Sequence, residues 1–496
     1  MKKTILTFFW ILIWWALYGQ SPHPKLQGLD EEIEFLLNQY EAVGLSVAVV
    51  KEDSLIYSKG FGLRDREKNL PMNENTSIPI GSTTKTFTSA LFGILYADGK
   101  ISFQEKPSKY IPQLEFYNDK MDNIITVGDL LSHKSGIGSV DASHVFFPPL
   151  NGNDFIARFK HLKPNGEISN SFQYSNAGYA LLGQILENIT RTQYEKYIRQ
   201  NLFEPLGLTG TYVSIDQMIN TNNFAKPYGK LGTNQEHIPF HYFGISKPDG
   251  AVISSANDMG KWMITWLNNG RYKSKQIIPE SYINIATTLK NILPQNNANH
   301  EDFLFGYGYG WFVQASKGEY LIQHGGNTAG FSCQLALYPH KKIGIIAMTN
   351  QHNSALPYFV EDIISNRLLD YERKAVSEYP TFVTDIYPIP ESLNSFNIET
   401  KITHQLNDYC GKYENKGHGI VSVIEENGHL FIIYPEYKFR LEHEKYNTFR
   451  MQPITEVTQY AVPDFQLNFN INEQGEIDLF DINFQPEHVI FHKIDN

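Results

Sequence analysis

The sequence predicts an α+β domain, in which helices flank one antiparallel sheet, followed by a small antiparallel β-barrel. Two observations carry this prediction. Up to about residue 371, strand-like apolar runs occur together with segments of helical periodicity. From Tyr409 onward, short alternating strands are separated by turn signals such as Asn427-Gly428 and Gln474-Gly475. Regular short strands of this kind are typical of a small antiparallel barrel or sandwich.

The elements of the first domain, expected over residues 28–371, follow from these spacings. Residues 29–43 predict the first helix. One antiparallel sheet is expected from strands at residues 45–51, 54–59, 320–324, 334–338 and 343–349. Helices that carry Ser82 and follow Asn176 would form the other layer. The active cleft is then expected between the sheet edge and the helical part.

A linker is predicted between the two domains. Polarity rises after the last helical pattern, and Pro380, Pro388 and Pro390 indicate a linker over residues 372–400. The barrel domain is expected over residues 401–496, with strands at residues 420–424, 430–434, 439–441, 465–471 and 477–480. A closed barrel could hold a ligand, but a structural role is favoured.

Ser82 and Lys85 are the first candidates for nucleophilic chemistry. Residues 79–81 break the preceding segment, and apolar residues then recur on one helical face at Phe87, Ala90, Leu91, Ile94 and Leu95. Ser82 is therefore at or near a helix N-terminus, with Lys85 one turn on and on the same side. A partly neutral lysine could take the serine proton, and the helix dipole would favour the alkoxide. The alternative is a helix cap followed by a solvated lysine.

Two downstream motifs supply partners for this pair. Tyr174-Ser175-Asn176 precedes a second helical pattern, and His324-Gly325-Gly326 interrupts a strand pattern over residues 320–337. A phenol beside a lysine can act as a general base and return the proton to a leaving group. An asparagine amide can hold both the lysine and a substrate amide. Paired glycines allow a backbone to approach a bound substrate closely.

Each partner motif has competitors in the chain. Tyr-x-Asn also occurs at Tyr282, expected on a surface helix, and at Tyr413, expected in the C-terminal domain. Lys134-Ser135-Gly136 matches the third motif by residue type. Ser82 to Lys85, by contrast, is the one Ser-x-x-Lys in the sequence.

Together these motifs resemble the serine β-lactamase and penicillin-binding superfamily, most closely the branch with class C β-lactamases, D-alanyl-D-alanine carboxypeptidases, D-aminopeptidases and related esterases. That superfamily carries Ser-x-x-Lys, then Tyr-x-Asn, then a Lys- or His-headed triplet ending in Gly. The resemblance covers roughly residues 28 to 370. Further matching segments are Asp129 to Gly136, Pro205 to Leu208, Gly250 to Asp258 and Tyr307 to Trp311. The C-terminal strands resemble a lipocalin-like domain appended to some members.

The resemblance implies a role for each motif residue. Ser82 would be the acyl-accepting nucleophile, Lys85 and Tyr174 would share the base role, and Asn176 would orient the substrate. The oxyanion hole would be formed by the backbone N–H groups of Ser82 and Asn327. The strand residues expected to bind substrate are His324, Gly325, Gly326 and Asn327. Acylation followed by hydrolysis needs no metal and no diffusible cofactor.

His324 departs from the class C β-lactamase pattern, in which Lys usually heads the third motif and helps receive the substrate carboxylate. A histidine near its reference pKa is mostly neutral at neutral pH, with a charge that changes between about pH 5.5 and 8.5. The resemblance therefore favours a D-peptidase or esterase over a strong β-lactamase.

The N-terminus predicts a secreted or periplasmic protein. Met1-Lys2-Lys3 precedes an apolar run from Ile5 to Leu17, which indicates a signal peptide over residues 1–20. Gly19 suits the last position before cleavage, but Leu17 is large, and an uncleaved membrane anchor is the alternative. The two cysteines, Cys333 and Cys410, lie in different predicted domains and are expected to be free and buried.

The formal net charge of −11 disfavours nucleic acid and anionic membranes as partners. A membrane contact is expected only if the leader stays uncleaved. The expected partner is a small-molecule or peptide substrate, with peptidoglycan fragments among the candidates. The predicted function is that of a serine acyl-hydrolase acting on D-amino-acid peptides, β-lactams or esters. A non-hydrolysing penicillin-binding or sensor protein, and a transacylase, remain as alternatives.

Overall fold

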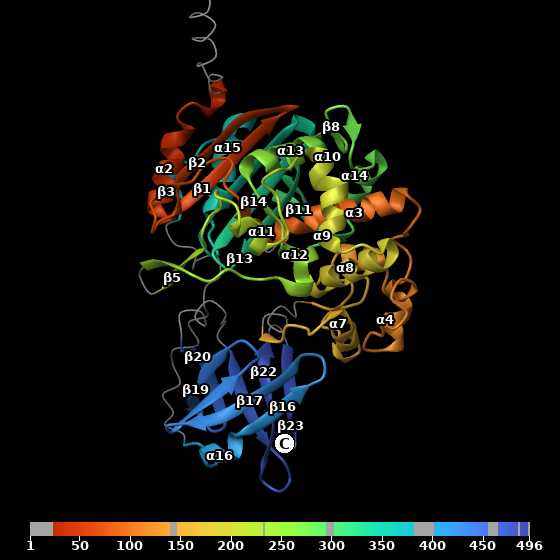
Figure 1. The fold of residues 1–496 in the computed structure, drawn as a ribbon, viewed down its shortest axis with the longest axis vertical. Coiled ribbons are helices and arrows are strands. Elements are labelled where there is room, and N and C mark those ends of the chain that lie inside the picture. The colour runs from red at the N-terminus through yellow and green to blue at the C-terminus, as the bar shows by residue number, and fades with distance from the viewer. Residues whose placement is uncertain are drawn as a thin grey trace, which may run out of the picture.

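The computed structural model describes residues 23–138, 146–231, 234–293, 302–380, 401–454, 465–484 and 487–494. They form a larger domain around a nine-stranded sheet and, beside it, a closed barrel built from the C-terminal strands (Figure 1). The predicted fold class is therefore confirmed. The leader predicted at residues 1–20 lies outside the described residues, and no helix within them is long and apolar enough to cross a bilayer.

The large sheet is antiparallel throughout, in the order β10-β11-β12-β13-β14-β15-β1-β2-β3. Its strands are β1 (Gly44–Lys51), β2 (Ser54–Asp65), β3 (Leu70–Pro71), β10 (Asn291–Ile292), β11 (Asp302–Tyr307), β12 (Phe312–Ser316), β13 (Glu319–Thr328), β14 (Phe331–Tyr338) and β15 (Ile343–Thr349). The five predicted strands lie within β1, β2, β13, β14 and β15. Strand β1 pairs with β15, so the two ends of the domain meet at the middle of the sheet.

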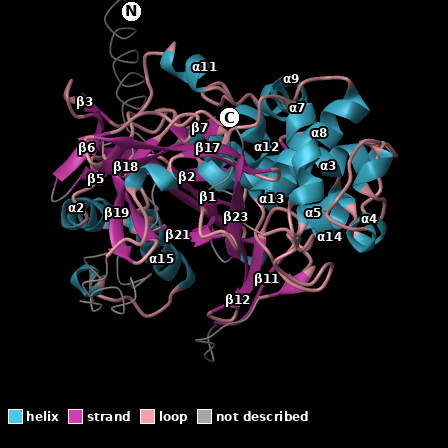
Figure 2. Ribbon diagram, turned by 90° about the horizontal axis from the view of Figure 1, so that it is seen from below, coloured by secondary structure: helices cyan, strands magenta, loops and turns pink. Residues whose placement is uncertain are grey.

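Helices cover both faces of the sheet, which explains why β1, β14 and β15 are almost wholly buried. Side chains alternate along β1: Leu45, Val47 and Val49 pack in one apolar cluster, and Ala48 and Val50 in the other. The first cluster includes α2 (Leu29–Gln39) and α15 (Leu356–Leu369). The second joins the sheet to the main helical layer, which Figure 2 shows gathered on one side of the molecule.

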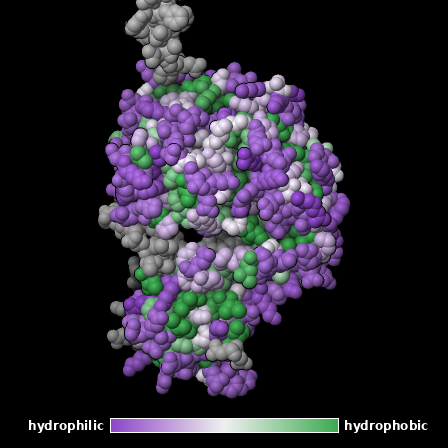
Figure 3. Space-filling model, in the orientation of Figure 1, coloured by the Kyte–Doolittle hydropathy of each residue, from purple (hydrophilic) through white to green (hydrophobic). Residues whose placement is uncertain are grey.

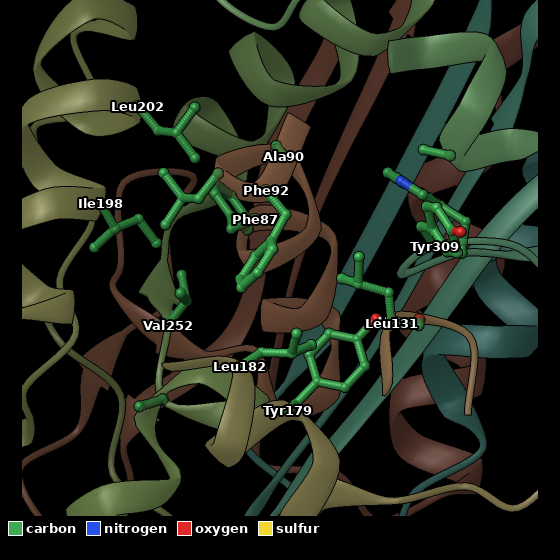
Figure 4. Packing of buried hydrophobic residues seen from close by; sticks show 14 of the residues in the cluster. Phe87, Ala90, Phe92, Leu131, Tyr179, Leu182, Ile198, Leu202, Val252 and Tyr309 are labelled. Atoms are coloured by element: carbon green, nitrogen blue, oxygen red, sulfur yellow. Dashed lines mark hydrogen bonds between the residues drawn. The ribbon is translucent and has the colours of Figure 1, made fainter. Parts of the chain in front are cut away.

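The main helical layer is centred on α3 (Thr84–Ala97), α8 (Asn176–Thr190) and α13 (Ala256–Leu267). Phe87 of α3 stacks on Trp262 of α13, with ring centroids 3.9 Å apart. Figure 4 shows residues of α3 and α8 side by side in this core. The other α-helices that the structure describes in this domain are α4 (Asp119–Ile124), α5 (Val127–Leu131), α7 (Gly152–Arg158), α9 (Tyr194–Ile198), α10 (Glu204–Leu206), α11 (Ile215–Ile219), α12 (Lys247–Gly250) and α14 (Glu280–Thr287).

Short elements complete the larger domain. Three two-stranded ribbons pair β4 (Ile78–Pro79) with β7 (Ile253–Ser254), β5 (Tyr228–Leu231) with β6 (Asn234–His237), and β8 (Arg271–Tyr272) with β9 (Lys275–Gln276). The first helix ends at Gln39 and not at residue 43, because Glu41 takes a left-handed φ of 51° that a helix does not continue through.

The barrel contains eight strands and closes between β16 and β23. They are β16 (Gly411–Asn415), β17 (Gly419–Glu426), β18 (His429–Ile433), β19 (Lys438–Lys445), β20 (Thr448–Pro453), β21 (Gln466–Ile471), β22 (Ile477–Phe484) and β23 (Glu487–Ile494), preceded by α16 (Leu406–Tyr409). The strands named from the sequence correspond to β17, β18, β19, β21 and β22, and the structure adds β16, β20 and β23. Figure 3 shows hydrophilic residues over most of this face of the larger domain and a greater share of hydrophobic residues on the barrel.

Two residues of the larger domain complete the apolar core of the barrel. Phe146 and Phe147 are 1% and 2% exposed and belong to the same cluster as the barrel side chains. The ring centroids of Phe146 and Phe147 lie 4.7 and 5.2 Å from that of Tyr434, and Phe147 also stacks on Phe491 at 5.7 Å. Arg158 of α7 donates a hydrogen bond of 2.7 Å to the Phe147 carbonyl oxygen. We call Phe146 and Phe147 the phenylalanine clip.

The beginning of the predicted linker packs on the larger domain. Tyr379 is 5% exposed, and its hydroxyl donates to Asp362 at 2.6 Å. Its carbonyl oxygen accepts from Gln39 of α2 at 3.0 Å. The larger domain thus continues to at least Tyr379, beyond the predicted boundary at residue 371, while residues 381–400 lie outside the described part.

Both cysteines are free, as expected, but only Cys333 is buried. Its sulfur lies 3.6 Å from the Thr83 hydroxyl. Cys410 is partly exposed, because it precedes β16 at the end of the barrel and is not in the larger core. The prediction that both are buried is therefore wrong for Cys410.

Phe147→Ala should loosen the barrel without unfolding the larger domain, because truncating a buried phenylalanine costs about 3–5 kcal/mol. Hydrogen exchange measured by mass spectrometry should show faster exchange in β18 and β23 and unchanged exchange in β1 and β15. Phe303→Ala is the control, because Phe303 is 60% exposed. Unchanged exchange in the barrel of the Phe147 variant would show that the clip does not stabilise it.

Candidate active site

Ser82 lies in the 3-10 turn η2 (Gly81–Thr83), directly before α3. Its side chain is partly exposed, unlike those of the helix residues that follow. Gly81 has a φ of 52°, and a Cβ atom there would lie 2.7 Å from the backbone N of Asn327. Only glycine meets both demands. The turn therefore holds Ser82 at the open end of α3, where the first backbone N–H groups of the helix favour negative charge.

Strand β13 passes directly against this turn. A Cβ atom at Gly326 would lie 1.9 Å from the Ile80 carbonyl oxygen and 3.1 Å from the Ser82 backbone N. The Thr83 hydroxyl donates to the His324 carbonyl oxygen at 3.1 Å. The backbones of the Ser82 turn and of residues 324–327 are thus in contact. The triplet that meets the serine is His324-Gly325-Gly326, rather than the competing segment at Lys134.

Lys85 brings three separate segments together at Ser82. Its side chain is 0% exposed. Its Nζ lies 3.3 Å from Ser82 Oγ, 2.5 Å from Asn176 Oδ1 and 2.8 Å from the Asp249 carbonyl oxygen. Three oxygen partners compensate the burial of an amine that could not otherwise leave water. The carbonyl oxygen of Asp249, in α12, was missed because backbone acceptors leave no signature in the residue types.

Tyr174 and Asn176 enter the site from the start of α8. Ser175 caps this helix, because its hydroxyl accepts a hydrogen bond of 3.1 Å from the Gly178 N–H. The cap fixes the turn on which the two motif residues lie. The Tyr174 ring centroid is 4.9 Å from Lys85 Nζ, and Tyr174 and Asn176 are both partly exposed. The structure therefore brings the predicted residues Ser82, Lys85, Tyr174 and Asn176 into one group.

His324 lies beneath the site rather than on its surface. The ring is 1% exposed, Nε2 is 3.0 Å from the Tyr307 hydroxyl, and Nδ1 is 2.6 Å from the Gly325 carbonyl oxygen. Burial, and then the charge of Lys85, lower the His324 pKa to about 3. The expected change of charge between pH 5.5 and 8.5 is therefore wrong. Direct binding of a substrate by this ring also finds no support, whereas Asn327 farther along β13 is exposed.

The competing tyrosines have other roles. Tyr282 is fully buried in α14, contrary to the expected surface position, and its hydroxyl lies 2.6 Å from Ser89 Oγ. Tyr413 is buried in the barrel, where its hydroxyl donates to the Tyr409 carbonyl oxygen at 2.8 Å. Both phenols thus serve packing in their own surroundings.

Comparison with known proteins agrees with this geometry. The family described as Beta-lactamase matches residues 29–363, and a domain of unknown function, DUF3471, matches residues 398–494. Protein flp of Staphylococcus aureus strain N315 is 28% identical over 355 residues, which cover 70% of this chain and 67% of that protein. Unguisins hydrolase ungD' of Aspergillus campestris is 25% identical over 352 residues, covering 66% of this chain and 62% of that protein.

Solved structures share the fold. The octameric penicillin-binding protein homologue from Pyrococcus abyssi superposes with a TM-score of 0.65 at 22% identity, covering 94% of this chain and 99% of that one. SurE superposes with a TM-score of 0.57 at 19% identity, covering 95% and 99%. Because the family match spans residues 29–363, which hold every residue of the site, the chain belongs to the Beta-lactamase family.

Proposed function

We propose that this protein is an extracytoplasmic serine acyl-hydrolase of the β-lactamase and DD-peptidase type, which forms an acyl-enzyme on Ser82. One observation carries the proposal: the buried Lys85 amine reaches Ser82 Oγ, Asn176 Oδ1 and the Asp249 carbonyl oxygen at once. A nucleophile with a base held in hydrogen-bond reach, and that base oriented by further groups, is the arrangement that activates a serine. The apolar run at residues 5–17 supports a periplasmic or secreted location.

The proposed reaction has two steps. Ser82 Oγ attacks the substrate carbonyl carbon while its proton passes to Lys85 or Tyr174, one of which must be in its basic form. The oxyanion is held by the backbone N–H groups of Ser82 and Asn327, whose segments are in contact. The proton then moves to the leaving group, and the acyl-enzyme forms. Water, deprotonated by the same groups, cleaves the ester and restores Ser82.

Substrates without a carboxylate at His324 fit this site best. A lysine at the head of the triplet would supply a permanent charge, whereas the buried His324 is neutral over the working pH range. We therefore favour esters or small D-aminoacyl amides over β-lactams as substrates. Asn176 would orient the substrate amide, and small peptides, including peptidoglycan fragments, are the partners to test.

Ser82→Ala should abolish covalent labelling by a fluorescent penicillin or a fluorophosphonate, because no other hydroxyl shares the Lys85 amine in the described contacts. Intact mass spectrometry checks this directly. Incubation with nitrocefin and p-nitrophenyl esters then separates the alternatives: steady turnover supports a hydrolase, and a single stoichiometric burst supports a sensor protein. An adduct of unchanged yield on the variant would reject Ser82.

Tyr174→Phe should lower kcat by about a hundredfold or more with little change in stability, because it removes one proton carrier and keeps the ring. Steady-state kinetics with p-nitrophenyl acetate measures the loss. Tyr282→Phe is the matched control, since it removes a buried hydroxyl that contacts Ser89 and not Lys85. A larger loss in the control would reassign the Tyr-x-Asn motif.

The preference between substrate types should not depend on a histidine charge. Because the His324 pKa is about 3, the ratio of kcat/KM for nitrocefin to that for p-nitrophenyl acetate should stay flat from about pH 5.5 to 8.5. A ratio that falls with an apparent pKa near 6.5 would contradict this.

The pH dependence of stability gives an independent check of the lowered His324 pKa. Between pH 6.5 and about 3 the unfolded chain binds a proton here that the folded chain does not. The free energy of unfolding should therefore fall as pH falls below 6.5, by about 1.4 kcal/mol per pH unit from this group. His324→Gln, which does not titrate, should remove this contribution.

A further inference from the structure

His133 accepts hydrogen bonds from the backbone N–H groups of both residues that flank Tyr174. Its carbonyl oxygen accepts a hydrogen bond of 2.7 Å from the Gln173 N–H. Its imidazole Nδ1 accepts one of 3.0 Å from the Ser175 N–H. One residue therefore fixes the backbone immediately before and immediately after the phenol that the proposed reaction needs. From the sequence, His133 lies in a segment that matches the superfamily, where it is expected to brace a turn rather than to do chemistry.

The ring of His133 also packs on the ring of Tyr174. Their centroids are 4.3 Å apart with an interplanar angle of 35°, the shortest of the ring contacts that His133 makes. Tyr307 and Tyr179 lie at 4.8 and 5.1 Å. The same histidine thus contacts both the backbone around Tyr174 and its side chain. The Tyr174 ring centroid in turn lies 4.9 Å from Lys85 Nζ.

The hydrogen bond from Ser175 requires an unprotonated Nδ1, so His133 must be neutral with its proton on Nε2. The surroundings of His133 favour this neutral form. Burial, followed by the charges of Lys85 and His324, lowers the His133 pKa well below 6.5. Burial raises the pKa values of the neighbouring Tyr179 and Tyr307 well above 10, so these two hydroxyl groups stay uncharged at working pH.

His133 occupies this position at a cost. It is 0% exposed, its Nε2 has no hydrogen-bond partner among the residues that the structure describes, and its backbone φ is 58°. A buried polar atom left unpaired is unfavourable, and a bulky residue with positive φ is strained. An apolar side chain would fill the space without the unpaired Nε2. The acceptor on Nδ1 is the property that such a side chain lacks.

From these contacts we infer that His133 is a positioning residue for Tyr174, acting through the Gln173 and Ser175 peptide groups and through ring packing. It touches no reacting atom. The inference rests on the proposed function, since it assigns His133 to the base of the same reaction. Loss of the Nδ1 acceptor would let the Tyr174 segment shift, and a misplacement of about 1 Å in a catalytic group costs about a hundredfold in rate.

Two substitutions of His133 separate the effect of its Nδ1 hydrogen-bond acceptor from the effect of its side-chain volume. His133→Leu keeps an apolar side chain and removes Nδ1, and it should lower kcat for p-nitrophenyl acetate about 10- to 100-fold with KM little changed. His133→Asn keeps an acceptor near the position of Nδ1, and asparagine tolerates positive φ. This variant should recover most of the lost kcat. Equal kcat losses in the two folded variants would contradict a role for the acceptor.

A double-mutant cycle with Tyr174→Phe tests whether His133 acts through Tyr174. Adding His133→Leu to Tyr174→Phe should lower kcat by less than about threefold, because the group to be positioned is gone. His352→Leu is the matched control, since His352 Nδ1 accepts a backbone N–H from Gly330 at 3.3 Å. Its effect should be the same with and without Tyr174→Phe. If His133→Leu lowers kcat by the same factor with and without Tyr174→Phe, the role of His133 is structural and the inference fails.

One measurement does not depend on activity. In protein labelled with 15N-serine, the Ser175 amide should be protected from hydrogen exchange in the wild type and in His133→Asn, and should exchange faster in His133→Leu. Unchanged protection in His133→Leu overturns the inference even if that variant is inactive. Failure of the proposed function would look different: the wild type itself would show no Ser82-dependent labelling or turnover.

Discussion

Backbone contact between the Ser82 turn and strand β13 is the constraint on which the site depends. A Cβ atom at Gly326 would lie 1.9 Å from the Ile80 carbonyl oxygen, and one at Gly81 would lie 2.7 Å from the Asn327 N. Two glycines therefore allow a helix start and a sheet strand to meet without side chains between them. The position of every other group follows from this contact, because α3 carries Lys85 away from the turn and into the layer that holds α8 and α12.

The buried Lys85 connects this contact to the helical layer. Its amine takes oxygen partners from the turn, from the start of α8 and from α12, which are brought together only in the folded chain. Low dielectric makes each of these hydrogen bonds stronger and makes the loss of any one more costly. The same burial keeps His324 and His133 neutral, since both lie in apolar surroundings and near the lysine charge. Neither histidine thus contributes charge to the site at neutral pH.

Much of this arrangement could be predicted from the sequence, and the rest fails for physical reasons. The apolar runs of β1, β14 and β15 indicated the sheet, and ordered motifs pointed to Ser82, Lys85, Tyr174 and Asn176. The burial of His324 and Tyr282 was missed, because the residue types do not show which side chains a neighbouring element covers. The roles of the Asp249 carbonyl oxygen and of the His133 peptide contacts were missed because backbone atoms have no residue-specific signature. The clip was missed because it joins elements far apart in the chain.

The phenylalanine clip has a consequence for how the chain is made. The larger domain cannot close its sheet until β15 is synthesised, because β15 pairs with β1. Phe146 and Phe147 stay unburied until the barrel is synthesised, and its last strand ends at Ile494. At roughly 5–20 residues per second, translation leaves a nearly finished domain with two adjacent phenylalanines unburied for several seconds or more. During that interval the clip is an exposed apolar surface, which the barrel buries once its strands are complete.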